Sequence, residues 1–259
     1  MLKIGRHIRG LIFDCDGTLA DTERDGHRVA FNQAFREAGL DWDWDPALYG
    51  ELLTVTGGKE RIRHYLTHFN TDFAGPADLD AFIAGLHQAK TAHYTALLAQ
   101  GRIPLRSGVE RLLGEARQAG LRLAIATTTT PANVSALLAS TLGQEGESWF
   151  DVIGAGDIVP AKKPAPDIYY YVLEQLRLDP AACMAFEDSE NGIIASRGAG
   201  LQTVVTVNDY TRDHDFTGAA IVLDTLGEPD QPSTVLQGGG INGAPYVNLA
   251  FLHKLHASA

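Results

Sequence analysis

The chain has 259 residues, which is enough to bury a sizeable core in one large domain or in two unequal ones. Its net charge of −11 argues against a nucleic-acid partner, because phosphate backbones are bound by clustered Lys and Arg. The sequence shows no apolar leader and no run near the ~20 apolar residues of a membrane span, so we expect a cytoplasmic protein with no membrane partner.

The first predicted element is a short buried strand at residues 8–13, and a helical region follows it. Within residues 21–102, helical patterns occupy 26–38, 58–69 and 79–99. This stretch is far too long for a crossover between neighbouring strands. We therefore predict a helical cap domain, 21–102, inserted into a core domain formed by 1–20 and 103–230. The two connections between them would form a natural hinge.

After the cap, strands and helices alternate. Apolar runs predict strands at 122–126, 151–153, 182–186 and 202–207. Helical periodicity predicts helices at 108–119, 131–142, 165–177 and 190–199. Such alternation is typical of an α/β fold in which helices cover both faces of a parallel sheet, so we predict a Rossmann-like core.

Two further segments carry structural predictions. The acidic and aromatic run at 41–45 (DWDWD) is interpreted as covering an edge of the cap. Residues 231–259 are assigned to a C-terminal tail, whose first part is rich in Gly and Pro. We expect this part to be mobile and to be followed by a short helix in YVNLAFLHKLH. We also expect the protein to be a monomer.

Polar side chains follow the predicted strands at the points where these end. Asp14 and Asp16 come directly after the first strand, Thr127 follows the second, Lys163 comes after the third and Asp188 follows the fourth. Ligands of an open parallel sheet bind at the carboxyl ends of its strands, so these side chains are expected to line one crevice.

Each residue type in this crevice suits phosphoryl chemistry. Three carboxylates repel one another and need a cation, for which Mg²⁺ with oxygen ligands is the best match. Asp14 and Asp16 flank the site, and the side chain of Cys15 between them should point the opposite way into the core. One carboxylate would be the nucleophile and the other the general acid and base. Lys163 and Thr127 would stabilise a transferring phosphoryl group.

The segments DCDGT, ATTT, KKP and EDSENG resemble, in this order, the four motifs of the haloacid dehalogenase-like hydrolase superfamily. They span the chain from about residue 8 to 207. The cap is similar to that of the β-phosphoglucomutase and phosphoglycolate phosphatase branch. The stretch ELLTVTGGKERI, 51–62, resembles the CbbY group, which includes phosphatases of xylulose 1,5-bisphosphate.

This resemblance implies roles for the core residues. Asp14 matches the nucleophile that forms an aspartyl-phosphate, and Asp16 matches the acid that protonates the leaving alcohol and later activates water. Asp14, Asp188 and the backbone carbonyl of Asp16 match the magnesium ligands. Thr127 and Lys163 match the phosphate anchors.

Three other core features belong to the same comparison. Thr128, next to Thr127, is a substrate-binding candidate. Glu187 is similar to a residue that supports the metal ligands. The Lys163–Pro164 peptide bond resembles one that is often cis in the family.

The cap contributes a second set of candidates, which lie in a glycine-rich turn that opens a helix: Gly57, Gly58, Lys59 and Arg61. Free N–H groups at a helix start attract anions, so this turn could bind the non-reacting phosphate of a bisphosphate. Glu23 matches a position that hydrogen-bonds a substrate hydroxyl. The segment ERDGHR has one residue more than the family pattern, which leaves the role of His27 open.

We therefore predict a magnesium-dependent phosphatase that acts on a sugar phosphate, xylulose 1,5-bisphosphate above all, through an aspartyl-phosphate. A β-phosphoglucomutase-like phosphosugar mutase is one alternative, because it uses the same four motifs. A phosphatase of broad sugar-phosphate or phosphoglycolate specificity is another, and a catalytically silent binding module is a third. Haloacid dehalogenation is disfavoured, because it needs neither a metal nor the second acid, Asp16.

Overall fold

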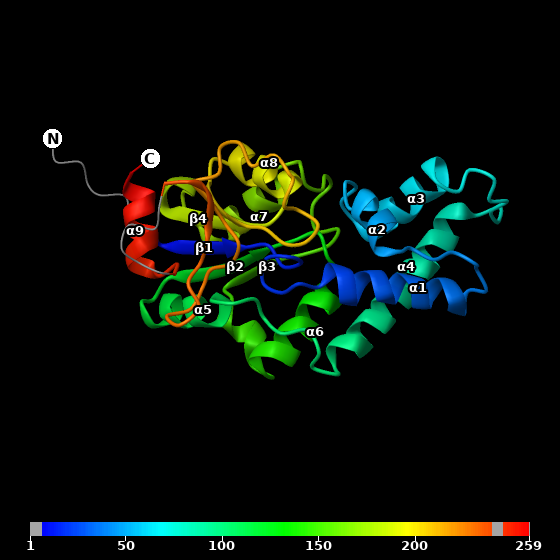
Figure 1. The fold of residues 1–259 in the computed structure, drawn as a ribbon, viewed down its shortest axis with the longest axis horizontal. Helices are drawn as coiled ribbons and strands as arrows, with labels where there is room; N and C mark the ends of the chain where they lie inside the picture. Colours follow the sequence, from blue (N-terminus) through cyan, green and yellow to red (C-terminus); the bar gives the residue numbers. More distant parts are fainter. Residues whose placement is uncertain (1–6, 240–245, 259) are drawn as a thin grey trace.

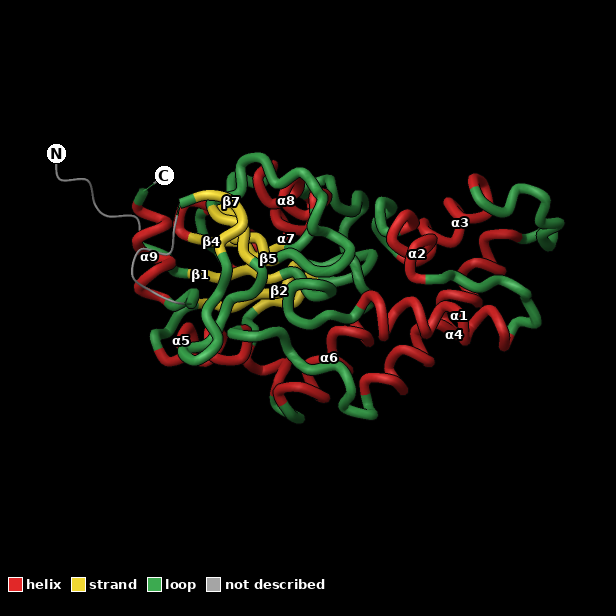
Figure 2. The backbone as a smooth tube through the Cα atoms, viewed as in Figure 1, coloured by secondary structure: helices red, strands yellow, loops and turns green. Residues whose placement is uncertain are grey.

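The computed structural model describes residues 7–239 and 246–258. An α/β core forms one half of the molecule, and a group of helices without strands forms the other (Figures 1 and 2). Within the described residues, one sheet runs in the order β3-β2-β1-β4-β5-β6-β7. Its strands are β1 (Gly10–Phe13), β2 (Arg122–Ala126), β3 (Val152–Gly154), β4 (Cys183–Glu187), β5 (Gln202–Thr206), β6 (Ile221–Leu223) and β7 (Val235–Gly238). All neighbours pair in parallel except β6 and β7.

Helices cover both faces of this sheet, as the alternation in the sequence predicts. Side chains of β1 alternate between two apolar clusters, with Leu11 and Phe13 on one face and Ile12 on the other. The first face packs against α5 (Val109–Gln118) and α6 (Pro131–Leu142), and the second against α7 (Asp167–Leu176) and α8 (Glu190–Gly198) (Figure 1). Since β1 lies in the middle of the sheet, its carboxyl end is enclosed by other strands.

The inserted region forms its own hydrophobic core. It contains α1 (Arg28–Glu37), α2 (Pro46–Leu52), α3 (Gly58–His68) and α4 (Leu79–Leu98). The prediction that the tryptophans of residues 41–45 cover an edge is wrong, because Trp42 and Trp44 are buried among the cap aromatics. Asn32 holds the backbone of Trp44 in place: its Nδ2 donates to Trp44 O at 3.0 Å, and its Oδ1 accepts from Trp44 N–H at 2.9 Å.

The two connections between cap and core lie side by side. Ala20 and Leu105 form an isolated antiparallel bridge, and Arg106 N–H donates to Leu19 O at 2.8 Å. The Arg106 guanidinium is buried, and it donates to backbone carbonyls of the loops that follow β1, β5 and β6. The hinge region is thereby tied to the carboxyl end of the sheet. The residue boundaries of the two domains stay a prediction.

The tail is more ordered than its composition suggests. Residues of β7 pair with the edge strand β6, and α9 (Leu249–Ala257) packs on α5 at the end of the core away from the cap (Figure 1). The expected C-terminal helix is thus confirmed, whereas the expectation of a mobile first part is wrong for residues 231–239. Residues 240–245 lie outside the described residues. The free edge of β6 offers hydrogen bonds that composition does not reveal.

Both cysteines of the chain, Cys15 and Cys183, are buried and not disulfide-bonded. The side chain of Cys15 lies in the apolar cluster, as predicted. Among the described residues, no helix is long and apolar enough to cross a membrane.

The packing of α9 predicts that the C-terminal helix contributes to stability. Leu252 is fully buried in the main cluster, so Leu252→Ala should lower the free energy of unfolding by about 2–5 kcal/mol. Leu236 of β7 is exposed, and Leu236→Ala should change stability by no more than about 0.5 kcal/mol. Urea denaturation of both variants measures the difference. Equal losses would contradict this assignment of α9 to the core.

Candidate active site

The side chains predicted to converge do lie together at the carboxyl end of the sheet. Asp14 directly follows β1, Thr127 follows β2 and Asp188 follows β4. Lys163 reaches in from the loop after β3, and its Nζ donates to Asp14 Oδ1 at 2.7 Å and to Glu187 Oε1 at 2.6 Å. The Lys163–Pro164 bond is cis.

Burial raises the electrostatic cost of this cluster. It raises the pKa of Asp14 to about 7, although the Lys163 cation opposes the shift. Burial, followed by the charges of Asp14 and Glu187, raises the pKa of Asp188. Burial alone would lower the pKa of Lys163, but Asp14 and Glu187 raise it, so Lys163 stays charged. One cation therefore faces three buried carboxyl groups.

This excess of carboxylates suits a divalent cation. Asp14, Glu187 and Asp188 each offer an oxygen, and these oxygens lie within 4.8 Å of one another. Glu187 also accepts hydrogen bonds from Lys163 and from Tyr169, so these two groups already stabilise part of its negative charge. Hard carboxylate oxygens are the ligands that Mg²⁺ prefers. These three carboxylates thus fit a magnesium ion.

Gly17 is needed for the close approach of the loops around Asp188. It has a φ of +82°, and a Cβ there would lie 2.7 Å from Asn208 Nδ2. The glycine of DCDGT therefore makes room for the side chains that contact Asp188. Thr18 Oγ1 donates to Asp188 Oδ1 at 3.4 Å, and Asn208 Nδ2 donates to Asp188 Oδ2 at 2.7 Å.

The carboxylate of Asp16 points away from the acidic cluster. It accepts from Thr22 Oγ1 at 2.6 Å and bonds His27 Nε2 at 2.8 Å. Burial favours a higher pKa, but His27 and Thr22 outweigh it and hold the pKa of Asp16 well below its usual range. On the far side of the imidazole, Lys90 Nζ lies 2.7 Å from His27 Nδ1. The Asp16 carboxylate is thus not part of the Asp14, Glu187 and Asp188 cluster, and its backbone carbonyl as a metal ligand stays a prediction.

A π-helical turn at Glu23–His27 explains how His27 reaches Asp16. The i→i+5 hydrogen bond His27 N–H to Thr22 O, at 2.8 Å, accommodates one more residue than an α-helical turn would. The turn occupies residues 23–27 of this segment, before α1 begins at Arg28. The idea that ERDGHR carries one residue more than the family pattern stays a prediction, and the sequence could not show which way the histidine would point.

On the cap side, Arg61 and Glu23 face the core across a cavity. Tyr49 joins them: its hydroxyl donates to Glu23 Oε2 at 2.5 Å and accepts from Arg61 Nη1 at 3.0 Å. Arg61 also donates to the carbonyls of Leu52 and Val55. The cavity, of about 260 Å³, is lined by Asp14, Asp16, Glu23, Arg61, Thr127, Thr128, Lys163, Asp188 and their neighbours.

The other members of the glycine-rich turn lie differently. Lys59 is half-exposed, and its Nζ pairs with Asp157 of the core at 2.6 Å, outside the wall of the main cavity. Gly57 and Gly58 line a small adjoining cavity together with Thr128. Gly57 has a φ of 97°, which favours glycine. The structure therefore brings Arg61 to the main cavity and leaves Lys59 at its rim.

Several residues at the boundary between cap and core escaped the sequence analysis. Thr56 Oγ1 donates to Lys163 O at 2.5 Å, and Asn191 Nδ2 donates to Thr54 O at 3.1 Å. Lys162 Nζ pairs with Glu60 of the cap at 2.8 Å. These contacts hold the cap against the core. No local motif could have found them, because each joins segments far apart in the chain.

A strand-end Asp paired with a Lys, beside an acidic cluster and under a helical cap, defines the class of this protein. Residues 8–200 match the haloacid dehalogenase-like hydrolase family, and the chain belongs to it. It is an enzyme of the phosphatase class of that family.

Within the family, the chain groups with the CbbY proteins. It is 49% identical to the plasmid-encoded CbbY of Cupriavidus necator over 225 residues, which cover 87% of this chain and 88% of that protein. The crystal structure of Rhodobacter sphaeroides CbbY with phosphate matches with a TM-score of 0.79 at 49% identity, covering 84% of this chain and 94% of that one. A mutant of the same protein in complex with xylulose-(1,5)bisphosphate matches with a TM-score of 0.80 at 48% identity, over 86% and 96% of the two chains.

The acidic cluster predicts that a divalent cation stabilises the protein. Mg²⁺ at about one hundred times its Kd should add about 2.7 kcal/mol to the free energy of unfolding. Asp188→Asn should remove most of this gain, because it removes a charged ligand. Asp157→Asn, at an exposed acid outside the cluster, should retain it. Thermal unfolding with and without Mg²⁺ measures the gain, and an equal gain in all three proteins would contradict the site.

Proposed function

We propose that this enzyme is a magnesium-dependent phosphatase whose substrate is xylulose 1,5-bisphosphate. The observation that carries the proposal is a cavity with phosphate-binding groups on two walls. The 2.7 Å Lys163–Asp14 pair lies on the core wall, and the Arg61 guanidinium lies on the cap wall. The complex of the Rhodobacter sphaeroides relative with xylulose-(1,5)bisphosphate supports this choice of substrate.

The first step would be attack by an Asp14 carboxylate oxygen on phosphorus, which forms an aspartyl-phosphate and breaks the bond to the sugar oxygen. Lys163 would neutralise charge on the phosphoryl oxygens, and Thr127 would donate to them. Asp14, Asp188 and the carbonyl of Asp16 would hold Mg²⁺, which supplies further neutralisation of these oxygens when bound.

Asp16 would act as the general acid and then as the general base. His27 and Thr22 keep its carboxylate ionised, so the proton for the leaving sugar oxygen must reach Asp16 first. His27 Nε2, at 2.8 Å, would pass that proton to Asp16, and Lys90 Nζ, 2.7 Å from His27 Nδ1, would replace it on the imidazole. In the second step, the regenerated Asp16 carboxylate would accept a proton from the water that attacks the aspartyl-phosphate. Phosphate and the enzyme's free Asp14 carboxylate result.

The cap would supply specificity. Arg61 is buried, and burial alone would lower its pKa; Tyr49 and Glu23 nevertheless raise the pKa, so the guanidinium stays charged. It would bind the phosphate that does not react, and Glu23 beside it would bind a sugar hydroxyl. Closure of the cap would keep bulk water away from the aspartyl-phosphate as it forms. A monomeric state and a cytoplasmic location stay predictions.

Phosphate release from a panel of substrates tests the proposal. With Mg²⁺, we expect strong preference for xylulose 1,5-bisphosphate over ribulose 1,5-bisphosphate and over sugar monophosphates. Asp14→Asn removes the nucleophile with little change in shape, so it should abolish turnover while the fold is kept. Broad activity on monophosphates would retain the chemistry and refute the substrate. Normal activity of Asp14→Asn would refute the mechanism.

The two cap cations make a sharper test of specificity. Arg61→Lys should lower kcat/KM for the bisphosphate about 10-fold or more and change that for a monophosphate much less, because a bidentate contact is lost. Lys59→Ala tests whether Lys59 leaves Asp157 and contacts the substrate. A selective loss of kcat/KM on the bisphosphate would show that Lys59 also binds the second phosphate. If Arg61→Lys weakened both substrate classes equally, Arg61 would not be the second phosphate anchor.

A further inference from the structure

A loop of four residues after β5, Asn208–Thr211, contacts both walls of the active site. Toward the core, Asn208 Nδ2 donates to Asp188 Oδ2 at 2.7 Å. The same side chain is fixed to its own loop, because its Oδ1 accepts from Tyr210 N–H at 2.9 Å. The backbone N–H of Asn208 donates to Thr211 Oγ1 at 3.0 Å, which closes the turn. The partner of Asp188 therefore moves with the loop.

Toward the cap, the same loop presents the ring of Tyr210. Although it belongs to the core, this ring packs against the aromatic cluster of the cap. It lies edge-on to Tyr49, with ring centroids 6.0 Å apart and planes at 66°. It also lies on Gly50 of α2, where a Cβ would be 3.2 Å from Tyr210 Cδ1. Within the described residues its buried hydroxyl has no hydrogen-bond partner, so the ring carries the contact.

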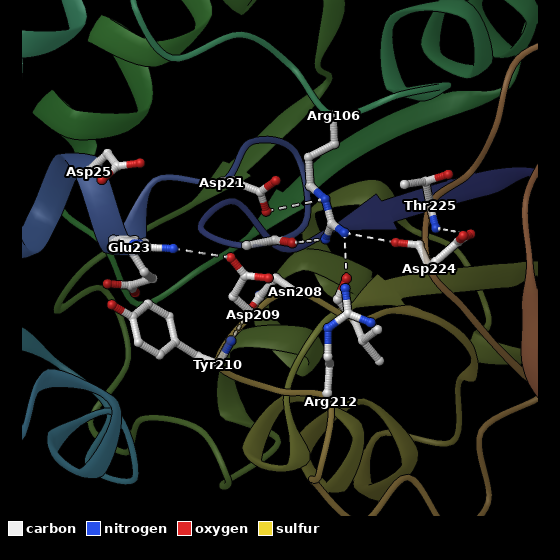
Figure 3. A pocket seen from close by; sticks show the side chains of 13 residues that line it. Asp21, Glu23, Asp25, Arg106, Asn208, Asp209, Tyr210, Arg212, Asp224 and Thr225 are labelled. Atoms are coloured by element: carbon white, nitrogen blue, oxygen red, sulfur yellow. Dashed lines mark hydrogen bonds and ion pairs between the residues drawn. The ribbon is translucent and has the colours of Figure 1, made fainter. Parts of the chain in front are cut away.

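The loop lies between two cavities. It separates the active-site cavity of about 260 Å³ from a second cavity of about 440 Å³, and Asn208 and Tyr210 line both. Figure 3 shows the second cavity, with Asp209 and Tyr210 on one side and Arg106 on another. Asp209 forms a solvent-exposed ion pair with Arg24, at 3.5 Å. Thr211 at the end of the loop is buried, and Tyr210 supplies the packing contact of the loop with α2 of the cap.

We propose that the Asn208–Thr211 loop couples closure of the cap to the position of the Asp188 carboxylate, with Tyr210 as the positioning residue. When α2 approaches, the Tyr210 ring packs on Gly50, the turn is located, and Asn208 orients Asp188. The tyrosine that Tyr210 touches, Tyr49, also bonds Glu23 and Arg61. Substrate bound in the cap and metal bound in the core would therefore favour each other. The inference rests on the proposed function in taking Asp188 as a metal ligand.

Other contacts between cap and core avoid this loop and supply a control. Lys59 of the cap pairs with Asp157 of the core at 2.6 Å, and Asp157 also pairs at 3.0 Å with Lys162 of the core, which bonds Glu60 of the cap. Asp157→Asn would weaken the contact of the cap with the core without touching Asp188 or its partners. A variant at Tyr210 weakens that contact through the loop. Comparing the two separates general loosening of the cap from the coupling proposed here.

The test is calorimetric titration of the substrate-free, full-length protein with Mg²⁺, which needs no turnover. Tyr210→Ala should weaken Mg²⁺ binding about 5-fold or more, within the usual range of coupling between sites. Tyr210→Phe keeps the ring and should bind within about twofold of the parent, as should Asp157→Asn. Gly50→Leu, which pushes on the ring from the cap side, should weaken binding in the parent and add nothing in a Tyr210→Ala background.

The outcomes are decisive in either direction. Unchanged Mg²⁺ affinity in both Tyr210→Ala and Gly50→Leu would overturn the coupling, as would an equal loss in Asp157→Asn. Equal weakening by Tyr210→Phe and Tyr210→Ala would assign the effect to the hydroxyl and overturn the role of ring packing. Absence of phosphate release by the parent protein would refute the proposed function and leave this binding result standing.

Discussion

The structure depends above all on the buried pair of Asp14 and Lys163. Their 2.7 Å contact joins the end of the central strand β1 to the loop that follows β3. A buried ion pair costs much desolvation energy, and here two further carboxyl groups, Glu187 and Asp188, crowd the same space. A fold selected for stability alone would not gather these charges. These charges fit a site that would bind a divalent cation and a phosphoryl group. The packing of the surrounding sheet offsets the free-energy cost of burying them.

In the proposed mechanism the cap would have a different task, which is to exclude water and still release product. It has its own aromatic core, so it keeps its shape as a unit. It meets the core through polar contacts, through the ring of Tyr210 and through apolar side chains of α1 and α4 (Ala30, Tyr94 and Leu98) that belong to the main core cluster. The π-helical turn at Glu23–His27 lies where the chain enters the cap, and it directs His27 to Asp16. The Asp16–His27 pair, to which we assign the proton transfer, thus lies where the chain enters the cap.

A loop that bonds Asp188 and packs on the cap would give this arrangement a physical route for communication. Asn208 and Tyr210 are two residues apart and are joined by a hydrogen bond, so a shift of the ring would be passed to the amide. The cavities on both sides of the loop leave it room to move. In many enzymes closure both shields the reaction and completes the catalytic arrangement. Here the completed element would be the orientation of Asp188.

The sequence by itself determined the α/β class, the inserted helical cap and the convergence of Asp14, Thr127, Lys163 and Asp188, because strand ends of a parallel sheet share one edge. The order of its four motifs also indicated the family. Only the tertiary structure decided the pairing of β7 with the edge of β6, the burial of Trp42 and Trp44, and the position of Lys59 against Asp157. The tertiary structure also decided that His27 bonds Asp16 and that Tyr210 contacts the cap. Each of these depends on contacts between segments distant in the chain, whereas periodicity and motif spacing report only on neighbours.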